Sequence, residues 1–181
     1  EHKSLESSDE YVHDPGHPLP FVPYGGAGMR IPSGTDTLVY LSRPLRGPQA
    51  VRGLVRAKVC LSSGARDTDV ILRLCDVGPD DSVFVVCDGA TRARYRNGWT
   101  SEPLQKGEIY PIDVLLGHVC YTVQAGHRLA LEITGSAFPK YDVNYGTAKR
   151  PAGDTGSIVS HNRVHCSGQW LSTLLLPLEK S

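Results

Sequence analysis

The sequence lacks any excess of charge and any long hydrophobic run. Its 181 residues carry 19 Lys and Arg against 19 Asp and Glu, so the formal net charge is zero. Nucleic-acid binding requires a basic surface that displaces counterions from phosphates, so no nucleic-acid partner is expected. The longest apolar run, at residues 83–87, is far shorter than the roughly 20 residues that a transmembrane helix requires. No membrane partner is expected either.

The short motifs of common catalytic sites are also missing. The nucleophile of an α/β-hydrolase lies in a G-x-S-x-G turn between a strand and a helix, and this pentapeptide is absent. Its nearest fragments are Gly135-Ser136 and Gly156-Ser157, which we predict to lie in turns or strands. Seven His leave open a Ser-His-Asp triad assembled by the fold, although no spacing indicates one. We therefore predict no catalytic residue in this chain.

Metal-binding patterns are equally sparse. Zinc sites need closely spaced Cys and His ligands, whereas His118 with Cys120 and His165 with Cys166 are isolated pairs. Calcium needs several oxygen ligands, and the candidates for one end of a sandwich are Asp67, Asp69, Asp76, Asp80 and Asp81. Because Asp is also typical of β-turns, the prediction is no metal and no cofactor, with calcium as the alternative.

Cysteine is scarce and shows no pairing pattern. The five residues are Cys60, Cys75, Cys87, Cys120 and Cys166, and no two form a C-x-x-C motif. The first four lie inside apolar runs, so we predict buried free thiols, with a disulfide framework as the alternative. Free thiols favour a cytoplasmic protein, and secretion stays open as the other compartment.

Glycine and proline, in contrast, are plentiful, with 19 and 13 residues that divide the chain into short elements. Residues 1–36 are polar and rich in both, which predicts an extended lead-in without regular structure. The chain starts with neither Met nor an apolar stretch, which indicates a fragment or a processed chain. Residues 37–181 are predicted to form a single domain.

From Thr37 onwards, short apolar segments alternate with turn residues. Over 70–74 the even positions are apolar and Arg73 is expected to face water, and over 128–133 Glu132 is expected on the outer face. We predict strands over 37–41, 51–61, 69–77, 82–87, 90–96, 108–116, 119–123, 128–134, 156–164 and 170–176. About ten short strands without helical periodicity predict an all-β sandwich of the jelly-roll type.

Aromatic side chains are candidates for binding a sugar. The residues considered are Tyr95, Trp99, Trp170, Tyr141 and Tyr145. Each is as well suited to a core or an interface as to a sugar platform, so both interpretations stay open.

Three arginines form a second candidate set. Arg92, Arg94 and Arg96 alternate along the predicted strand 90–96, which places their guanidinium groups on one face. A solvated face with local ion pairs is the favoured interpretation. Binding of an anion or of an acidic surface is the alternative.

Several segments, in order along the chain, together resemble one known family. They are residues 13–20 (HDPGHPLP) with Gly25-Gly26, 62–69 (SSGARDTD), 72–77 (LRLCDV), 87–89 with 92–96, 107–110 (GEIY), 125–129 (AGHRL), 136–144 (SAFPKYDVN) and 171–177 (LSTLLLP). This pattern is similar to the C-terminal non-catalytic domain of X-Pro dipeptidyl-peptidases and cocaine-esterase-type acyl hydrolases. The resemblance implies a jelly roll of the galactose-binding-like type.

In that family the domain follows an α/β-hydrolase domain that carries a Ser-Asp-His triad. The resemblance therefore implies a catalytic domain upstream of Glu1 as the partner, with homo-oligomer contacts as a second expectation. It also implies that the residues after the glycine pair approach the mouth of the active site, namely Gly26, Ala27, Gly28, Met29 and Arg30. The expected function is support of a serine hydrolase acting on peptides, esters or amides. A free-standing carbohydrate-binding module and a pure interaction domain are the alternatives.

Overall fold

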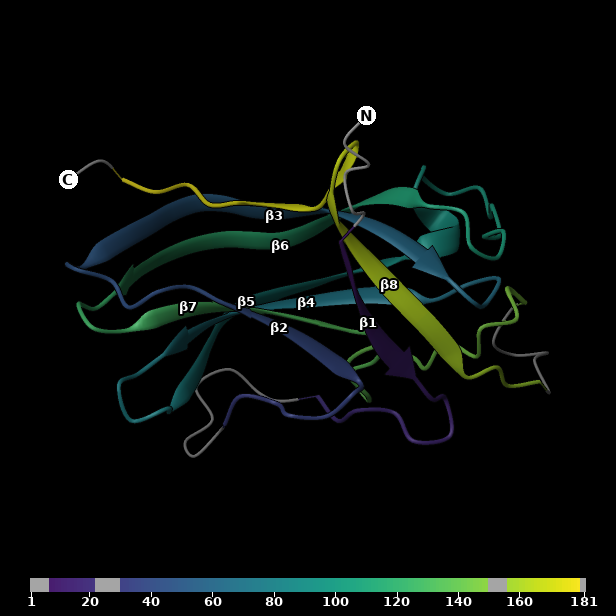
Figure 1. Cartoon of the computed structure of the whole chain (residues 1–181), viewed down its shortest axis with the longest axis horizontal. Coiled ribbons are helices and arrows are strands. Elements are labelled where there is room, and N and C mark those ends of the chain that lie inside the picture. The colour runs from purple at the N-terminus through teal and green to yellow at the C-terminus, as the bar shows by residue number, and fades with distance from the viewer. Residues whose placement is uncertain (1–6, 22–29, 150–155, 180–181) are drawn as a thin grey trace.

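The computed structural model, which describes residues 7–21, 30–149 and 156–179, is a sandwich of two antiparallel β-sheets (Figure 1). The larger sheet has the order β1-β8-β3-β10, with β6 also paired to β3 and β9 to β8, and the smaller has the order β2-β7-β4-β5. The elements are β1 (Ser8–His13), β2 (Thr37–Leu41), β3 (Gln49–Ser63), β4 (Asp69–Val77), β5 (Val83–Arg92), the 3-10 turn η1 (Ala93–Tyr95), β6 (Tyr110–Val123), β7 (Arg128–Thr134), β8 (Ser160–Ser167), β9 (Trp170–Leu171) and β10 (Thr173–Leu175). The predicted all-β sandwich is confirmed.

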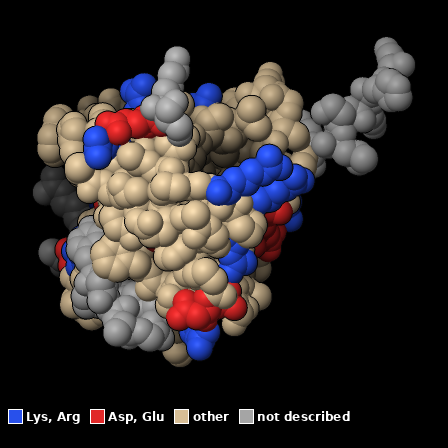
Figure 2. All heavy atoms as spheres, turned by 90° about the vertical axis from the view of Figure 1, so that its left-hand side faces the viewer, with Lys and Arg blue, Asp and Glu red and all other residues tan. Residues whose placement is uncertain are grey.

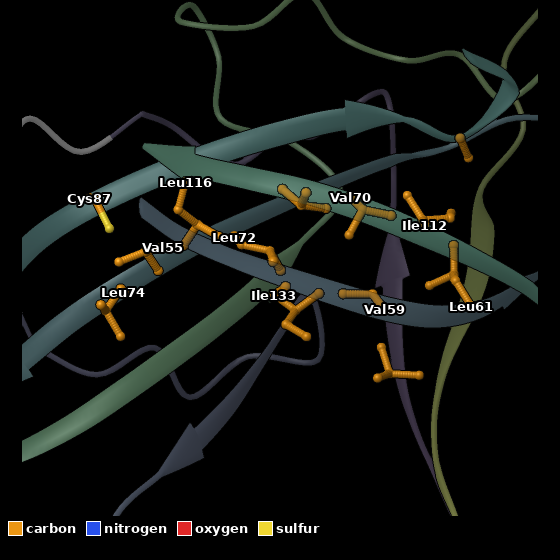
Figure 3. Packing of buried hydrophobic residues seen from close by; sticks show 14 of the residues in the cluster. Val55, Val59, Leu61, Val70, Leu72, Leu74, Cys87, Ile112, Leu116 and Ile133 are labelled. Carbon is orange, nitrogen blue, oxygen red and sulfur yellow. The ribbon is translucent and has the colours of Figure 1, made fainter. Parts of the chain in front are cut away.

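The main core fills the space between the two sheets. Figure 3 shows apolar side chains of β3, β4, β6 and β7 meeting there. Val59, Leu72, Ile112 and Ile133, one from each of these strands, are all at least 98% buried. Burial of each such side chain contributes about 1.5–3 kcal/mol, so this layer is the main source of stability.

Some strands have the predicted bounds and others differ: β8 covers 160–167 where 156–164 was predicted, and the strand predicted over 170–176 is divided into β9 and β10. β2, β4 and β7 begin and end at the predicted residues. The two strands predicted over 82–96 are the single strand β5, and the two predicted over 108–123 are the single strand β6. Gly117, with a φ of 111°, lies where the register between β3 and β6 shifts. The glycine that suggested a turn therefore forms part of a β-bulge.

The lead-in differs from the prediction because it contains a strand and covers a sheet. β1 pairs with β8 along its whole length. Closer to β2, Ile31 packs against a second apolar cluster on the outer side of the smaller sheet. That cluster comprises Cys75, Val77, Val83, Val85 and Ala130. The covered face also holds Arg73 and Glu132, so the expectation that Arg73 faces water was wrong.

All five cysteines are free thiols, but not all are buried. Cys60, Cys75 and Cys87 are buried as predicted, and burial raises the pKa of the Cys87 thiol to about 11. Cys120 is exposed, which corrects the prediction for this residue. It shares the outward side of β6 with His118, because alternate strand residues point to the same face.

Candidate functional site

The segment that the family resemblance places near an active site is described only at its last residue. Residues 26–29 lie outside the described residues. Arg30 is exposed, and its Nη1 donates a hydrogen bond of 3.1 Å to the main-chain oxygen of Asp80. Asp80 lies in the turn between β4 and β5. Arg30 is therefore held against this hairpin, and a role of the segment near substrate stays a prediction.

Of the five aromatic candidates, the two tryptophans lie apart from the others. Trp99 is fully exposed in the loop after η1, and Trp170 is partly buried where β9 pairs with β8. Tyr95 shares a hollow of about 460 Å³ with Tyr141, and neither tryptophan lines it. Tyr95 and Tyr141 are therefore the two candidates that share a hollow, and a role of these aromatic residues in sugar binding stays a prediction.

The three arginines do not form a solvated stripe. β5 ends at Arg92 and η1 follows, so the alternation along 90–96 is broken. Arg92 donates two hydrogen bonds to the carboxylate of Asp69, at 2.8 and 2.9 Å, and Arg94 is buried. Arg96 donates to the main-chain oxygen of Glu102 at 2.7 Å. The predicted local ion pairs are present, whereas solvation of the whole stripe was wrong.

Asn144 is the centre of a buried polar network that the sequence did not single out. Its Nδ2 donates to Asp67 Oδ2 at 3.0 Å and to Asp69 Oδ1 at 2.9 Å, and its main-chain oxygen lies 2.9 Å from His13 Nε2. Burial raises the pKa of Asp67. The two carboxylates proposed for calcium are thus bound by Asn144 and by arginine. Asp67 and Asp69 are spaced in the sequence like Arg92 and Arg94, and this equal spacing was the pattern that could have predicted the ion pairs.

Asp76 on β4, the next candidate calcium ligand, contacts β6 and the turn that precedes β7. Tyr121 on β6 donates its hydroxyl to Asp76 Oδ2 at 2.8 Å, and His127 Nδ1 lies 2.9 Å from Oδ1. Burial and this hydrogen bond raise the pKa of Tyr121 to about 12. Phe84 stacks on the Tyr121 ring at 5.5 Å. Across the described part of the chain, no three His, Cys, Asp or Glu side chains are grouped to hold a metal ion.

Of the two serines considered for nucleophilic chemistry, Ser157 is exposed and lies before β8, and Ser136 has structural surroundings. Ser136 is buried and its Oγ accepts the N–H of Leu19 at 2.8 Å. Ser62 Oγ lies 2.9 Å from His165 Nε2, and both residues belong to paired strands, β3 and β8. An acyl-transfer site also needs free N–H groups aimed at an oxyanion, whereas Ser62 lies within the β3–β8 ladder. The pair is a cross-strand contact.

A groove opens one side of the sandwich between β10 and the edge formed by β2 and β7. Its volume is about 360 Å³, and Figure 2 shows the surface hollowed beside a group of Lys and Arg side chains. Its walls are mainly apolar, with Leu129 and Leu131 on one side and Leu174 and Leu176 on the other. Nothing in the sequence pattern indicated this groove, because each lining residue also fits the core.

The outer face of β3, β6 and β10, called here the uncovered face, is the second exposed apolar region. Leu115 is 62% exposed, and Leu54 and Leu175 are also exposed. A trough of about 670 Å³ runs over it between Arg56, Leu115 and Tyr95 of the neighbouring η1. The outer face of the smaller sheet, in contrast, is covered by the lead-in.

Comparison with known proteins gives one consistent result. Residues 1–175 match the family described as the X-Pro dipeptidyl-peptidase C-terminal non-catalytic domain. The chain is similar to a cocaine esterase from Rhodococcus sp. (strain MB1 Bresler), with 34% identity over 97% of this chain and 33% of that protein.

Solved structures agree with this match. An alpha-amino acid ester hydrolase has a TM-score of 0.88 and 25% identity over 98% of this chain, and an aminopeptidase from the marine sediment archaeon Thaumarchaeota archaeon has a TM-score of 0.85 and 25% identity over 97%. In each case the chain spans 33% of the relative's length. The sequence, matched from residue 1 to 175, thus belongs to the X-Pro dipeptidyl-peptidase C-terminal non-catalytic domain family.

Proposed function

We propose that the chain is the accessory domain of a serine hydrolase, of the X-Pro dipeptidyl-peptidase or acyl esterase type, and that it packs on a catalytic α/β-hydrolase domain. The proposal rests on the match to the cocaine esterase, which covers 97% of this chain but 33% of the esterase. The relatives are an esterase, an ester hydrolase and an aminopeptidase, so hydrolysis of esters or peptide bonds is the chemistry that they share.

The uncovered face is the surface on which we place the catalytic domain. It combines exposed leucines with cations, a composition that suits a protein interface, where apolar side chains and Arg are enriched and partners are complementary in charge. Arg52 pairs with Glu179 at 2.8 Å, whereas Arg56 and Lys58 form no ion pair within the described ranges. The partner surface is therefore apolar with acidic residues that meet Arg56 and Lys58.

We further propose that the segment ending at Arg30 helps to shape access to substrate. Its support is the hydrogen bond from Arg30 to the β4–β5 hairpin, which places Arg30 at that end of the sandwich. Contacts between copies of the enzyme are a second use of the exposed surfaces.

A reducing compartment, the cytoplasm, is the proposed location. Its support is the five free thiols, of which three are buried and so placed as small apolar side chains. Among the described residues, no helix has the length and hydrophobicity needed to cross a bilayer.

The test compares purified residues 1–181 with the full-length enzyme. The isolated chain is expected to fold, by circular dichroism and a cooperative melt, and to hydrolyse neither p-nitrophenyl esters nor X-Pro p-nitroanilides. The full-length enzyme is expected to hydrolyse one of these classes and to be inactivated by a serine-directed phosphonate. Turnover by residues 1–181 that the phosphonate abolishes would contradict the proposal.

A further inference from the structure

The groove between β10 and the β2–β7 edge exposes part of the hydrophobic core. Its volume of about 360 Å³ would hold on the order of a dozen waters at about 30 Å³ each. The lining offers those waters few hydrogen-bond partners, because most of it is Leu, Ile, Val and Ala. Apolar surface in such a hollow is costly to hydrate, so the groove suits an apolar occupant.

β10 offers a free strand edge along one wall of this groove. β10 is the last strand in the order of the larger sheet, and its other edge pairs with β3. On β3, the N–H of Arg52 donates to the main-chain oxygen of Pro177, so even-numbered residues of β3 direct their backbone groups towards β10. Leu174 is opposite Ala57, an odd-numbered residue, and its own N–H and C=O therefore point to the free edge.

We propose that this groove receives an extended stretch of the same polypeptide, N-terminal to residue 1 in the full-length enzyme. The stretch pairs with the free edge of β10 and places alternate apolar side chains between Leu129 and Leu176. The inference rests on the proposed function, because it takes this chain as the C-terminal third of a longer hydrolase.

The path of the chain leads to this groove. The main-chain oxygen of Ser7, the residue before β1, accepts the N–H of Cys166 on β8 at 2.9 Å. Cys166 lines the groove, so the polypeptide enters β1 beside the opening. Tyr40, also in the lining, donates its hydroxyl to Asp9 of β1 at 2.8 Å. A stretch preceding β1 therefore needs no long connection to reach β10.

Tethering favours this occupant over a second copy of the chain. The free edge of β10 is three residues long. A stable interface between separate proteins buries about 1,200–2,000 Å² of surface, and so short a strand edge is small beside such an area. A segment of the same polypeptide has a high effective concentration, so a short strand and a few apolar contacts suffice.

The test measures amide hydrogen exchange by NMR in three proteins. They are residues 1–181, the same chain extended by about 40 of its natural upstream residues, and the full-length enzyme. An extension of about 40 residues is too short to form a domain of its own. The amide of Leu174 is expected to exchange at least about tenfold more slowly in the extended chain than in residues 1–181. The amide of Leu72, in the middle of β4, is expected to stay unchanged and serves as the reference.

Two matched variants of the extended chain locate the effect. Leu174→Lys, in the groove, is expected to remove the added protection of neighbouring β10 amides, whereas Leu115→Lys, on the uncovered face, is expected to retain it. If Leu174→Lys does not fold, the comparison of the unmodified proteins still decides.

Three outcomes would overturn the inference. Equal exchange in all three proteins would mean that nothing covers the groove. Protection in the full-length enzyme alone would assign the groove to a folded surface of the catalytic domain and leave the proposed function intact. Protection in residues 1–181 that rises with protein concentration, together with a dimer in sedimentation, would assign it to a second copy.

Discussion

Arg73 and Glu132 form an ion pair inside the molecule, with 2.7 Å between Arg73 Nη2 and Glu132 Oε2. The two residues are directly opposite on β4 and β7, and their side chains are 8% and 1% exposed. They lie on the outer face of the smaller sheet, which the lead-in covers. Each charge is therefore kept from water and neutralised mainly by the other.

Removal of one member of this pair is expected to be costly. Arg73→Met leaves the Glu132 carboxylate buried without its cation, which lowers the free energy of unfolding by about 3–5 kcal/mol in urea titration. Arg73→Met with Glu132→Leu is expected to recover most of this loss. The control is Arg52→Met, whose partner Glu179 is half exposed, with a change of at most about 1 kcal/mol. Similar small losses for both arginines would show that water screens the buried pair.

A substitution at Asn144 tests the importance of the buried polar network. Asn144→Asp places a third carboxylate beside Asp67 and Asp69 and removes two donors, so the free energy of unfolding is expected to fall by about 2–4 kcal/mol at pH 7. Asn97→Asp makes the same chemical change beside Glu102 at the surface, where a loss of about 0.5 kcal/mol or less is expected. Equal melting temperatures for the two variants would contradict the network.

Acid is expected to loosen the pairing of β1 with β8. Hydrogen bonds from His161, 2.9 Å away, and from Arg163, 2.8 Å away, lower the pKa of Glu10 from its ordinary value of 4.5. A carboxylate with a lowered folded-state pKa stabilises the fold above its unfolded-state pKa, and this contribution is lost as the pH falls through the folded-state value. Melting temperatures from pH 6 to 3 should therefore fall less steeply for Glu10→Gln than for the wild type. Parallel curves would contradict this role of Glu10.

The strands predicted most accurately are those whose alternation of apolar and polar residues depends only on packing in the core. β2, β4 and β7 have their predicted bounds because alternation and flanking turn residues coincide there. Burial on the outer side of β4 was not predictable from β4, because it depends on distant residues such as Ile31. The glycines inside β5 and β6 misled for a related reason. Gly89 allows close contact with β6 and Gly117 forms part of a bulge, but in sequence each looks like a turn residue.

The candidate surfaces were harder to foresee than the fold. A leucine such as Leu115 on an outward face and one such as Leu174 in the groove look alike in sequence, and topology alone separates them. The family resemblance indicated a missing catalytic partner, which local patterns did not. The Asn144 network needed three segments more than 20 residues apart to meet, as its hydrogen bonds to Asp67 and Asp69 show.

Gly89 is expected to be irreplaceable because β5 passes close to β6 there. A Cβ atom at Gly89 would meet the main-chain oxygen of Leu115, and a backbone atom cannot move aside as a flexible side chain can. Gly89→Ala is expected to lower the free energy of unfolding by about 3 kcal/mol. Gly47→Ala, which has no atom within 4 Å of the new Cβ, is the control and should change it by about 0.5 kcal/mol or less. Comparable chemical denaturation midpoints would refute this packing constraint.

The uncovered face is expected to matter in the full-length enzyme and not in the isolated chain. Leu115→Asp with Leu175→Asp changes two exposed side chains, so residues 1–181 should keep their free energy of unfolding within about 0.5 kcal/mol. If the catalytic domain packs on this face as proposed, the same changes bury two carboxylates in the interface of the full-length enzyme. We expect a separate, earlier melting transition, faster proteolysis between the domains and a lower kcat/KM.

Leu171→Asp is the matched control, because Leu171 is equally exposed but lies on β9, outside the uncovered face. It should leave the melt and kcat/KM of the full-length enzyme unchanged. If Leu171→Asp separates the domains and the double variant does not, the catalytic domain packs near β9, because an introduced carboxylate disrupts only the interface that buries it.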